Sequence, residues 1–508
     1  MNLHTPTPAP ARFLRDELLK RTTSRCPVCH APCPAEVWRT GGFPPKVLLK
    51  RTCPEHGEAT ACIASDARFY WLAQGKAENA CCSSRGKEAD SSTAPDIRLL
   101  TSAATNSCCS AAGANTGTLG RNAHPGDALG VQEKLSTCLA LIEIVNSCNL
   151  ACPTCYADSP VGTGARVDAV PLADLQRRIQ GVIDRKGGIE ILQLSGGEPT
   201  LHPQFFELLR WLHANPGVDY VLLNTNGVRI AQDDAFAREL GETFRYGKFQ
   251  LYLQFDGPQS DGQQALRGAD LRAVRERCLE RCREMNVPVT LAMTVTPENL
   301  AFLWDAIEFG LRWPNVRGIS FQPVFTSGRT SNAVAAVYDR RAGKPNGDVE
   351  EPDGGHRPPL QRLNTADIIL AAVGQSSGKL RFEDFTPLPC GDPNCATIGY
   401  LLKLDGAVRS VSDFIDFAKV QDFLGTKVHY KLEDLMKCGC DSEPLGDLLK
   451  KFELDETHTF RLFIKPFMDA WSWDEDRIDR CCTHVIRPDG KLDSFCRYYS
   501  GFADCTVK

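Results

Sequence analysis

The stretch Val145-Asn-Ser-Cys-Asn-Leu-Ala-Cys-Pro-Thr-Cys-Tyr156 decides the fold of this chain. It places Cys148, Cys152 and Cys155 directly after the apolar run Leu139–Val145, which has the length and β-branched content of a buried strand. Three closely spaced cysteines at the end of a strand can hold three irons of a four-iron cluster, which leaves the fourth iron open for chemistry. Bacterial ferredoxins use C-x2-C-x2-C instead, so the three-residue first gap is a distinguishing feature.

Strands and helices alternate on either side of this stretch, from Cys138 to Arg329. Such alternation predicts a parallel sheet with outer helices, and six units suit a partial (β/α)6 barrel with its site at the carboxyl ends of the strands. The expected strands are Leu139–Val145, Ile189–Leu194, Tyr220–Asn224, Gln250–Phe255, Val289–Val295 and Gly318–Pro323. The expected helices include Asp174–Asp184, Phe205–His213 and Leu271–Met285.

Polar motifs follow three of these strands. In Ser195-Gly-Gly-Glu-Pro-Thr-Leu-His-Pro203, Gly196 and Gly197 let the backbone approach a ligand closely, and Glu198 can accept hydrogen bonds from an ammonium group. Any one such motif could be an ordinary turn, but their recurrence at successive strand ends indicates a binding site. The candidates to contact a carboxylate, ribose hydroxyls or substrate at the next two strand ends are Asn224, Asn226, Gln254 and Asp256.

Together these residues resemble the radical S-adenosylmethionine (SAM) superfamily. The resemblance implies that Cys148, Cys152 and Cys155 carry a catalytic 4Fe-4S cluster, and that Gly196–Glu198 hold the amino end of SAM. Many relatives place an aromatic residue before the last cysteine to pack the adenine. Thr154 stands there in this chain, and Tyr156 is the candidate adenine contact instead.

Two knuckle motifs indicate a metal module at the N-terminus, residues 1–76. Arg25-Cys-Pro-Val-Cys29 and Arg51-Thr-Cys-Pro-Glu-His-Gly57 supply Cys26, Cys29, Cys53 and His56, at a spacing typical of zinc ribbons and rubredoxin-like sites. The segments Glu36–Arg39 and Lys46–Lys50 are expected to form the strands that carry these knuckles. The ligand types leave a mononuclear Zn or Fe open, and Cys33 could substitute for His56.

Two further cysteine groups lie outside the core of 136–340. The low-complexity insertion 77–135 contains the vicinal pairs Cys81-Cys82 and Cys108-Cys109, which either join Cys138 in another cluster or belong to a redox-sensitive segment. The C-terminal region, 341–508, is expected to hold an auxiliary 4Fe-4S cluster without an open iron. Its ligands are Cys390, Cys395, one of Cys481 and Cys482, and Cys496. On one helix face, Cys278 and Cys282 are expected to pack as small hydrophobic residues.

Composition narrows the class of protein. The chain has 508 residues and 23 cysteines, and an odd count without a signal-peptide pattern favours metal ligation in a reducing compartment. A net charge of −5 gives no argument for a nucleic-acid partner. No apolar run approaches the roughly 20 residues needed to cross a bilayer. We expect a cytoplasmic protein, with peripheral membrane contact if its substrate is a lipid.

The order of the parts supports a closer resemblance. The CPxC and TCPEHG knuckles, the core, the C-x4-C element at Cys390–Cys395 and the cysteine-rich tail at Cys481–Cys496 resemble the tetraether lipid synthase group. Its archaeal members were described earlier as pterin methyltransferases. The stretch Phe463–Ala470 belongs to the match, whereas the insertion departs from the family's compact cysteine element. The resemblance implies an N-terminal rubredoxin-like iron and several four-iron clusters.

The implied reaction is carbon–carbon coupling of lipid hydrocarbon chains, started by a 5′-deoxyadenosyl radical and supplied with electrons by a flavodoxin- or ferredoxin-type donor. A lipid enzyme predicts an apolar channel between core and tail, with Phe463, Phe467, Trp471 and Trp473 as candidate wall residues. The alternative is a radical SAM methyltransferase acting on a pterin-like or other small molecule. A non-catalytic iron–sulfur electron-transfer protein is a third interpretation, against which the SAM-binding motifs argue.

Overall fold

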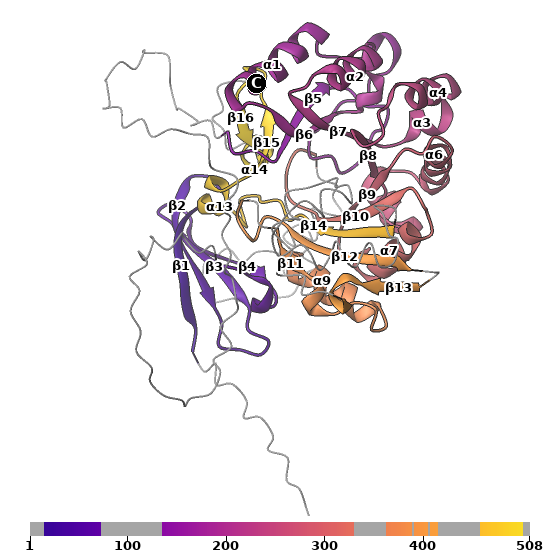
Figure 1. Ribbon diagram of the computed structural model, residues 1–508. Coiled ribbons are helices and arrows are strands. Elements are labelled where there is room, and N and C mark those ends of the chain that lie inside the picture. Colours follow the sequence, from indigo (N-terminus) through magenta and orange to yellow (C-terminus); the bar gives the residue numbers. More distant parts are fainter. Residues whose placement is uncertain are drawn as a thin grey trace, which may run out of the picture. The chain divides into compact units, whose positions relative to one another are not determined.

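The computed structural model describes residues 15–72, 135–329, 362–388, 391–404, 407–414 and 458–500 (Figure 1). The chain divides into two units, Met1–Trp71 with Glu133–Lys508, and Leu72–Gln132. Every helix and strand that the structure describes belongs to the first unit. The predictions for Cys81, Cys82, Cys108, Cys109 and Cys390 lie outside the described residues.

The N-terminal module is a four-stranded antiparallel sheet in the order β1-β2-β3-β4. Its strands are β1 Glu17–Arg25, β2 Pro32–Arg39, β3 Val47–Cys53 and β4 Gly57–Ala64. Val37, Val47 and Leu49 are fully buried on one face, because alternate residues of a strand point to the same side. The two knuckles lie at the β1–β2 and β3–β4 turns, as the sequence predicts.

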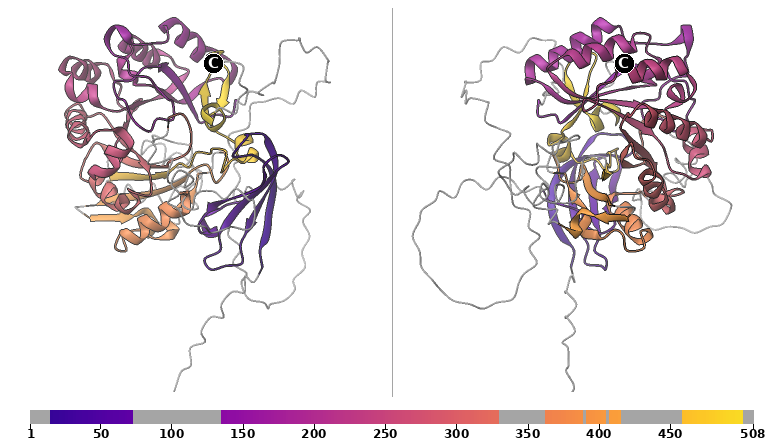
Figure 2. Two further views of the ribbon diagram at one scale, coloured as in Figure 1. Left: turned by 180° about the vertical axis from the view of Figure 1, so that it is seen from behind. Right: turned by 45° about the vertical axis from the view of Figure 1, so that its right-hand side comes forward.

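Six adjacent parallel strands in chain order form the core, and they confirm the partial (β/α)6 barrel. The strands are β5 Leu139–Val145, β6 Ile189–Gly196, β7 Val218–Thr225, β8 Phe249–Gln254, β9 Val289–Val295 and β10 Val316–Pro323. Figures 1 and 2 show the magenta and pink helices on the outer side of these strands. They are α1 Leu172–Lys186, α2 Phe205–Ala214, α3 Val228–Gln232, α4 Asp234–Thr243, α5 Ser260–Arg267, α6 Arg272–Glu284 and α7 Leu303–Leu311.

The C-terminal region continues this sheet at both edges. Strand β14 (Thr459–Ile464) pairs parallel to β10, and β15 (Thr483–Ile486) pairs parallel to β5. Each covers a row of backbone groups that an edge strand would otherwise expose. The remaining strands are antiparallel to their neighbours: β11 Thr386–Pro387, β12 Thr397–Leu404, β13 Ala407–Ser410 and β16 Leu492–Ser494. The helices of this region are α9 Thr365–Gln375, α13 Glu475–Asp479 and α14 Phe495–Ser500.

Between the strands and the outer helices lies a continuous apolar core. Cys278 and Cys282 of α6 are fully buried in it beside Leu279, which confirms that they pack as hydrophobic residues. Among the described helices, none is long and apolar enough to cross a membrane.

Candidate active site

A cavity of about 290 Å³ lies at the carboxyl ends of the barrel strands. Nearly all the candidate cluster and SAM residues of the core line it, although they come from separate segments of the chain. They are Cys148, Cys152, Cys155, Tyr156, Gly196, Gly197, Glu198, Asn224, Asn226 and Gln254. Asp256 is the candidate that does not line it. The structure therefore assembles the strand-end motifs around one space.

The loop that carries the three cysteines is held by backbone hydrogen bonds and by Arg329. The N–H of Cys148 donates to Pro160 O at 2.8 Å, and Cys155 and Arg329 exchange backbone bonds at 2.7 and 2.9 Å. Arg329 Nε also donates to Cys152 O at 2.8 Å. Burial raises the pKa of the Cys148 thiol to about 12. Because metal ligation requires the thiolate, an iron cluster that binds here would release thiol protons.

The paired glycines of the second strand end bring β6 into contact with this cysteine loop. Gly196 has φ +119°, and a Cβ there would lie 2.1 Å from Val145 O. A Cβ on Gly197 would lie 2.0 Å from Ser147 O, so no other residue fits at either position. Gly197 and Glu198 donate their N–H groups to Val145 O and Ser147 O at 2.8 and 3.0 Å. The glycines thus join the SAM motif to the cysteine loop, a packing role that the sequence pattern did not predict.

Glu198 is held in a single orientation at the cavity wall. Its carboxylate accepts hydrogen bonds from Thr200 Oγ1 and Thr225 Oγ1, both at 2.7 Å, and from Asn226 N at 2.8 Å. Burial raises its pKa, and these bonds act in the opposite direction. Asn226 Nδ2 donates to Asn149 Oδ1 of the cysteine loop at 2.7 Å. On the neighbouring side, Asn224 Nδ2 donates to Ser195 Oγ at 3.2 Å.

The fourth strand end differs from the others because Asp256 is fully buried and ion-paired. Arg267 Nε donates to its carboxylate at 2.7 Å. Gln254 lines the cavity, and its amide oxygen, when turned toward Arg267, accepts from both terminal nitrogens at 2.8 and 2.9 Å. The role of Asp256 as a direct SAM contact stays a prediction. Arg267 itself was not singled out from the sequence.

Tyr156 connects the cysteine loop to the C-terminal helix α14. Its hydroxyl lies 3.3 Å from Ser195 Oγ, and its ring meets the Tyr499 ring edge-on with 4.8 Å between centroids. Tyr498 and Tyr499 donate to the two oxygens of Glu143 at 2.9 and 2.8 Å. This tyrosine pair was not singled out from the sequence, since no local motif links α14 to β5.

Four of the five C-terminal candidate ligands are described, and all four are buried free thiols. They are Cys395, Cys481, Cys482 and Cys496. These thiols lie close enough to affect the Lys465 ammonium. Burial lowers the pKa of Lys465, but the negative charge of the thiolates would raise it, and the net effect is an increase. Lys465 donates to Thr483 Oγ1 at 2.9 Å and forms no ion pair with the acidic side chains that the structure describes. Cys138 and Cys482 both line the cavity, and Cys138 N donates to Cys482 O at 2.8 Å.

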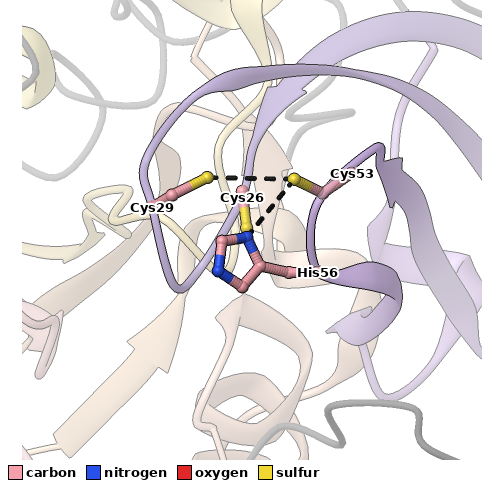
Figure 3. A group of neighbouring side chains, drawn as sticks. All are labelled: Cys26, Cys29, Cys53 and His56. Carbon is pink, nitrogen blue, oxygen red and sulfur yellow. Dashed lines mark hydrogen bonds between the residues drawn. The ribbon is translucent and has the colours of Figure 1, made fainter.

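The N-terminal knuckles converge as Figure 3 shows. The ligand atoms of Cys26, Cys29, Cys53 and His56 lie within 4.8 Å of one another. Cys53 Sγ is 3.8 Å from Cys29 Sγ and 3.6 Å from His56 Nδ1. The hydrogen bond with His56 lowers the pKa of Cys53 to about 6, which favours the thiolate. Three sulfurs and one imidazole nitrogen at this spacing suit a tetrahedral ion. The spare Cys33 is buried beside Cys26 and Cys53, outside this group.

The family comparison agrees with this geometry. Residues 142–310 match the model of the radical SAM superfamily. The chain contains a radical SAM domain. Residues 18–65 match the HMPTM N-terminal zinc ribbon domain, which covers the knuckle module. A radical SAM domain binds SAM and a 4Fe-4S cluster, and the cavity described above offers thiols, a rigid carboxylate and amides to such ligands.

Individual relatives match the chain over different shares of its length. It is 26% identical over 537 residues to 7,8-dihydro-6-hydroxymethylpterin dimethyltransferase of Methanocaldococcus jannaschii, covering 94% of this chain and 93% of the relative. It is 28% identical over 185 residues to GTP 3′,8-cyclase of Syntrophomonas wolfei, covering 36% and 55% of the two chains. Streptococcus suis SuiB bound to SAM is 16% identical with a TM-score of 0.32, and the match covers 38% of this chain and 43% of that chain.

Proposed function

We propose that Cys148, Cys152 and Cys155 hold the 4Fe-4S cluster and that Gly196–Glu198, Asn224, Asn226, Gln254 and Tyr156 surround SAM. When bound, these groups supply a 5′-deoxyadenosyl radical that abstracts hydrogen from a substrate. The chain's own residues orient the cofactor, exclude water and present one C–H bond to the radical. The observation that carries this proposal is the shared cavity, in which the cysteine loop and the polar strand ends face one another. A flavodoxin- or ferredoxin-type protein is the proposed electron donor.

The reaction that we propose is carbon–carbon coupling between lipid hydrocarbon chains. It is supported by the apolar part of the cavity wall, which lies between core and tail where such a channel is expected. The wall residues there are Leu139, Leu141, Phe325, Leu388, Ile398, Phe463, Phe467 and Phe495. The other two aromatic candidates lie elsewhere: Trp471 packs against Arg51 and Trp473 against Arg25. A lipid substrate would also give the enzyme peripheral membrane contact.

Methyl transfer to a pterin-like ring is the second candidate. The opposite part of the wall, on the inner side of the barrel, carries amide and hydroxyl groups that could bind a polar heterocycle. They are Gln193, Gln250, Tyr252, Thr290, Ser320 and Gln322. The printed name of the Methanocaldococcus jannaschii relative describes such a reaction for that protein.

Two experiments test these candidates in turn. Anaerobic reconstitution with SAM and dithionite should yield 5′-deoxyadenosine, and its absence would contradict the radical mechanism. Mass spectrometry of lipids from a deletion strain should then show loss of coupled chains, whereas unchanged lipids would favour the second candidate. Complementation with Phe463→Gln should restore less coupling than its matched variant Gln322→Met if the apolar wall holds the substrate.

For the C-terminal region we propose an auxiliary 4Fe-4S cluster on Cys390, Cys395, Cys496 and one of Cys481 and Cys482. The half-buried Lys465 ammonium has no acidic partner among the described residues, and an anionic tetrathiolate cluster would offset its charge. Iron and sulfide analysis should give two clusters and one lone Zn or Fe ion on Cys26, Cys29, Cys53 and His56. One cluster would contradict the auxiliary site, and a third would implicate Cys138 and the insertion.

A further inference from the structure

Arg267, the last residue of α5, is fixed in one orientation at the cavity wall. Its Nε and Nη2 donate to the two carboxylate oxygens of Asp256 at 2.7 and 2.9 Å, and Nη2 also donates to Thr294 Oγ1 at 3.1 Å. Asp256 is fully buried, has φ +62°, and accepts a further bond from Thr294 N at 3.2 Å. A two-point arginine–carboxylate contact defines direction as well as charge.

The Nη1 side of this guanidinium faces the cysteine loop. Arg267 Nη1 donates to Thr154 O, directly before Cys155, at 3.3 Å. The next residue, Gly268, packs so close to Pro153 that an added Cβ would lie 3.3 Å from its Cδ. The end of α5 thus contacts the loop through backbone and side chain.

The charges around Asp256 do not balance by themselves. Its carboxylate also pairs with Arg275 at 3.6 Å, and Arg275, like Arg267, is almost wholly removed from water. Among the described residues, Asp256 is the ion-pair partner of both arginines. Two guanidinium groups and one carboxylate leave a buried positive charge, which is costly unless an anion lies nearby. The cysteine loop, where Arg267 Nη1 meets Thr154 O, is the place where such an anion would lie.

We propose that Arg267, oriented by Asp256, is the positioning residue that stabilises the reduced state of the cluster on the cysteine loop. Reduction adds one electron, taken from the external donor and passed on to the SAM sulfonium, so the cluster gains one negative charge beside a fixed cation. The inference rests on the proposed cluster ligands but holds for either proposed substrate. It gives Asp256 a role that acts through Arg267.

The test is a redox titration of the reconstituted full chain, followed by electron paramagnetic resonance with and without SAM. A SAM-sensitive signal reports the cluster with an open iron. Arg267→Gln should shift its midpoint potential to a more negative value, and Arg267→Lys should shift it less. Asp256→Asn should shift the potential in the opposite direction, because it removes a negative charge. Arg281→Gln is the matched control: Arg281 is a buried arginine of α6 that donates to Ile230 O at 3.1 Å, and its loss should leave the potential unchanged.

The sign of the shifts in midpoint potential distinguishes an effect of charge from a general disturbance of the structure. An unchanged potential in Arg267→Gln, or shifts of the same sign in Arg267→Gln and Asp256→Asn, would overturn the inference while the cluster assignment stands. If Arg267→Gln assembles no SAM-sensitive cluster, Arg267→Lys and Asp256→Asn still test the inference. Potential shifts of opposite sign in these two variants are expected, and shifts of the same sign would overturn it. A wild-type chain without any SAM-sensitive signal would overturn the cluster assignment and, with it, this inference.

Discussion

The knuckle site and the cysteine loop both place cysteines on turns that leave β-strands, yet their surroundings differ. In the knuckle site four ligand atoms lie within 4.8 Å of one another, an arrangement that closes around one ion. In the loop, Cys148, Cys152 and Cys155 face a cavity that they share with the glycine motif. The two sites therefore differ in the space opposite the cysteines more than in the number of cysteines: the knuckles close on one another, and the loop opens onto a cavity.

The two regions also differ in what they support. Beside the knuckles, the buried Arg51 donates to the carbonyl oxygens of Ala470 and Trp471. Lys20 pairs with Asp474 at 2.6 Å, and Ser24 Oγ donates to Trp473 O at 2.6 Å. The module therefore stabilises the segment that leads to Cys481. We expect changes at the loop to alter chemistry and changes at the module to alter stability.

The largest effect is expected at the loop. Cys152→Ala should lower SAM cleavage at least about a thousandfold, equivalent to about 4 kcal/mol in the barrier, because one proposed cluster ligand is lost. The measurement is 5′-deoxyadenosine formed by reconstituted protein. Cys278→Ala, which removes a buried thiol of α6, should retain cleavage. Equal loss in both variants would contradict the distinction between ligand and core cysteines.

Removing a knuckle ligand should affect stability instead. Cys53→Ser should lose the N-terminal ion and lower the free energy of unfolding by several kcal/mol, since binding of a structural metal contributes directly to folding. Metal analysis and thermal unfolding measure both quantities, and the SAM-sensitive cluster signal should remain. Loss of that signal together with the ion would contradict the distinction between the two regions, because the cysteine loop would then depend on the module.

A smaller loss is expected from Arg51→Met. The substitution leaves the carbonyl oxygens of Ala470 and Trp471, buried and partly buried, without their donor, which should cost about 3 kcal/mol of unfolding free energy. Arg21→Met is the matched control, because Arg21 forms an exposed ion pair with Glu36 that should contribute at most about 1 kcal/mol. Chemical denaturation measures both values. Similar values for the two variants would argue against a supporting role of the module.

The smallest effect is expected from Tyr499→Phe, which removes a hydrogen bond to Glu143 and should cost about 1–2 kcal/mol at pH 7. Burial raises the pKa of Tyr499 well above its usual value near 10. The folded state therefore keeps the neutral form, and its stabilising contribution is present below about pH 10 and is lost as the pH rises further. The unfolding free energies of wild type and variant should converge above that pH. Tyr246→Phe, at a half-exposed tyrosine, should show no such convergence.

The local sequence pattern was sufficient to predict the strands of the core and the motifs that line much of the cavity. The expected strand Leu139–Val145 matches β5 to the residue, and Val289–Val295 matches β9, because strands of a parallel sheet buried on both faces are apolar runs. The cysteine loop and the glycine motif were found because each is a short motif next to such a strand. The sequence did not reveal β14 and β15 as edge strands, since their partners β10 and β5 lie far away in the chain.

By itself, the sequence determined the radical SAM core, the cysteine loop and the knuckle module, because those depend on residues a few positions apart. Only the tertiary structure decided what lies opposite them. Arg267 meets Thr154 across 113 positions, and Tyr499 meets Glu143 across 356. Such contacts depend on how the sheet brings distant strand ends together. Charge balance and burial at the cavity are therefore properties of the folded chain, which no local motif contains.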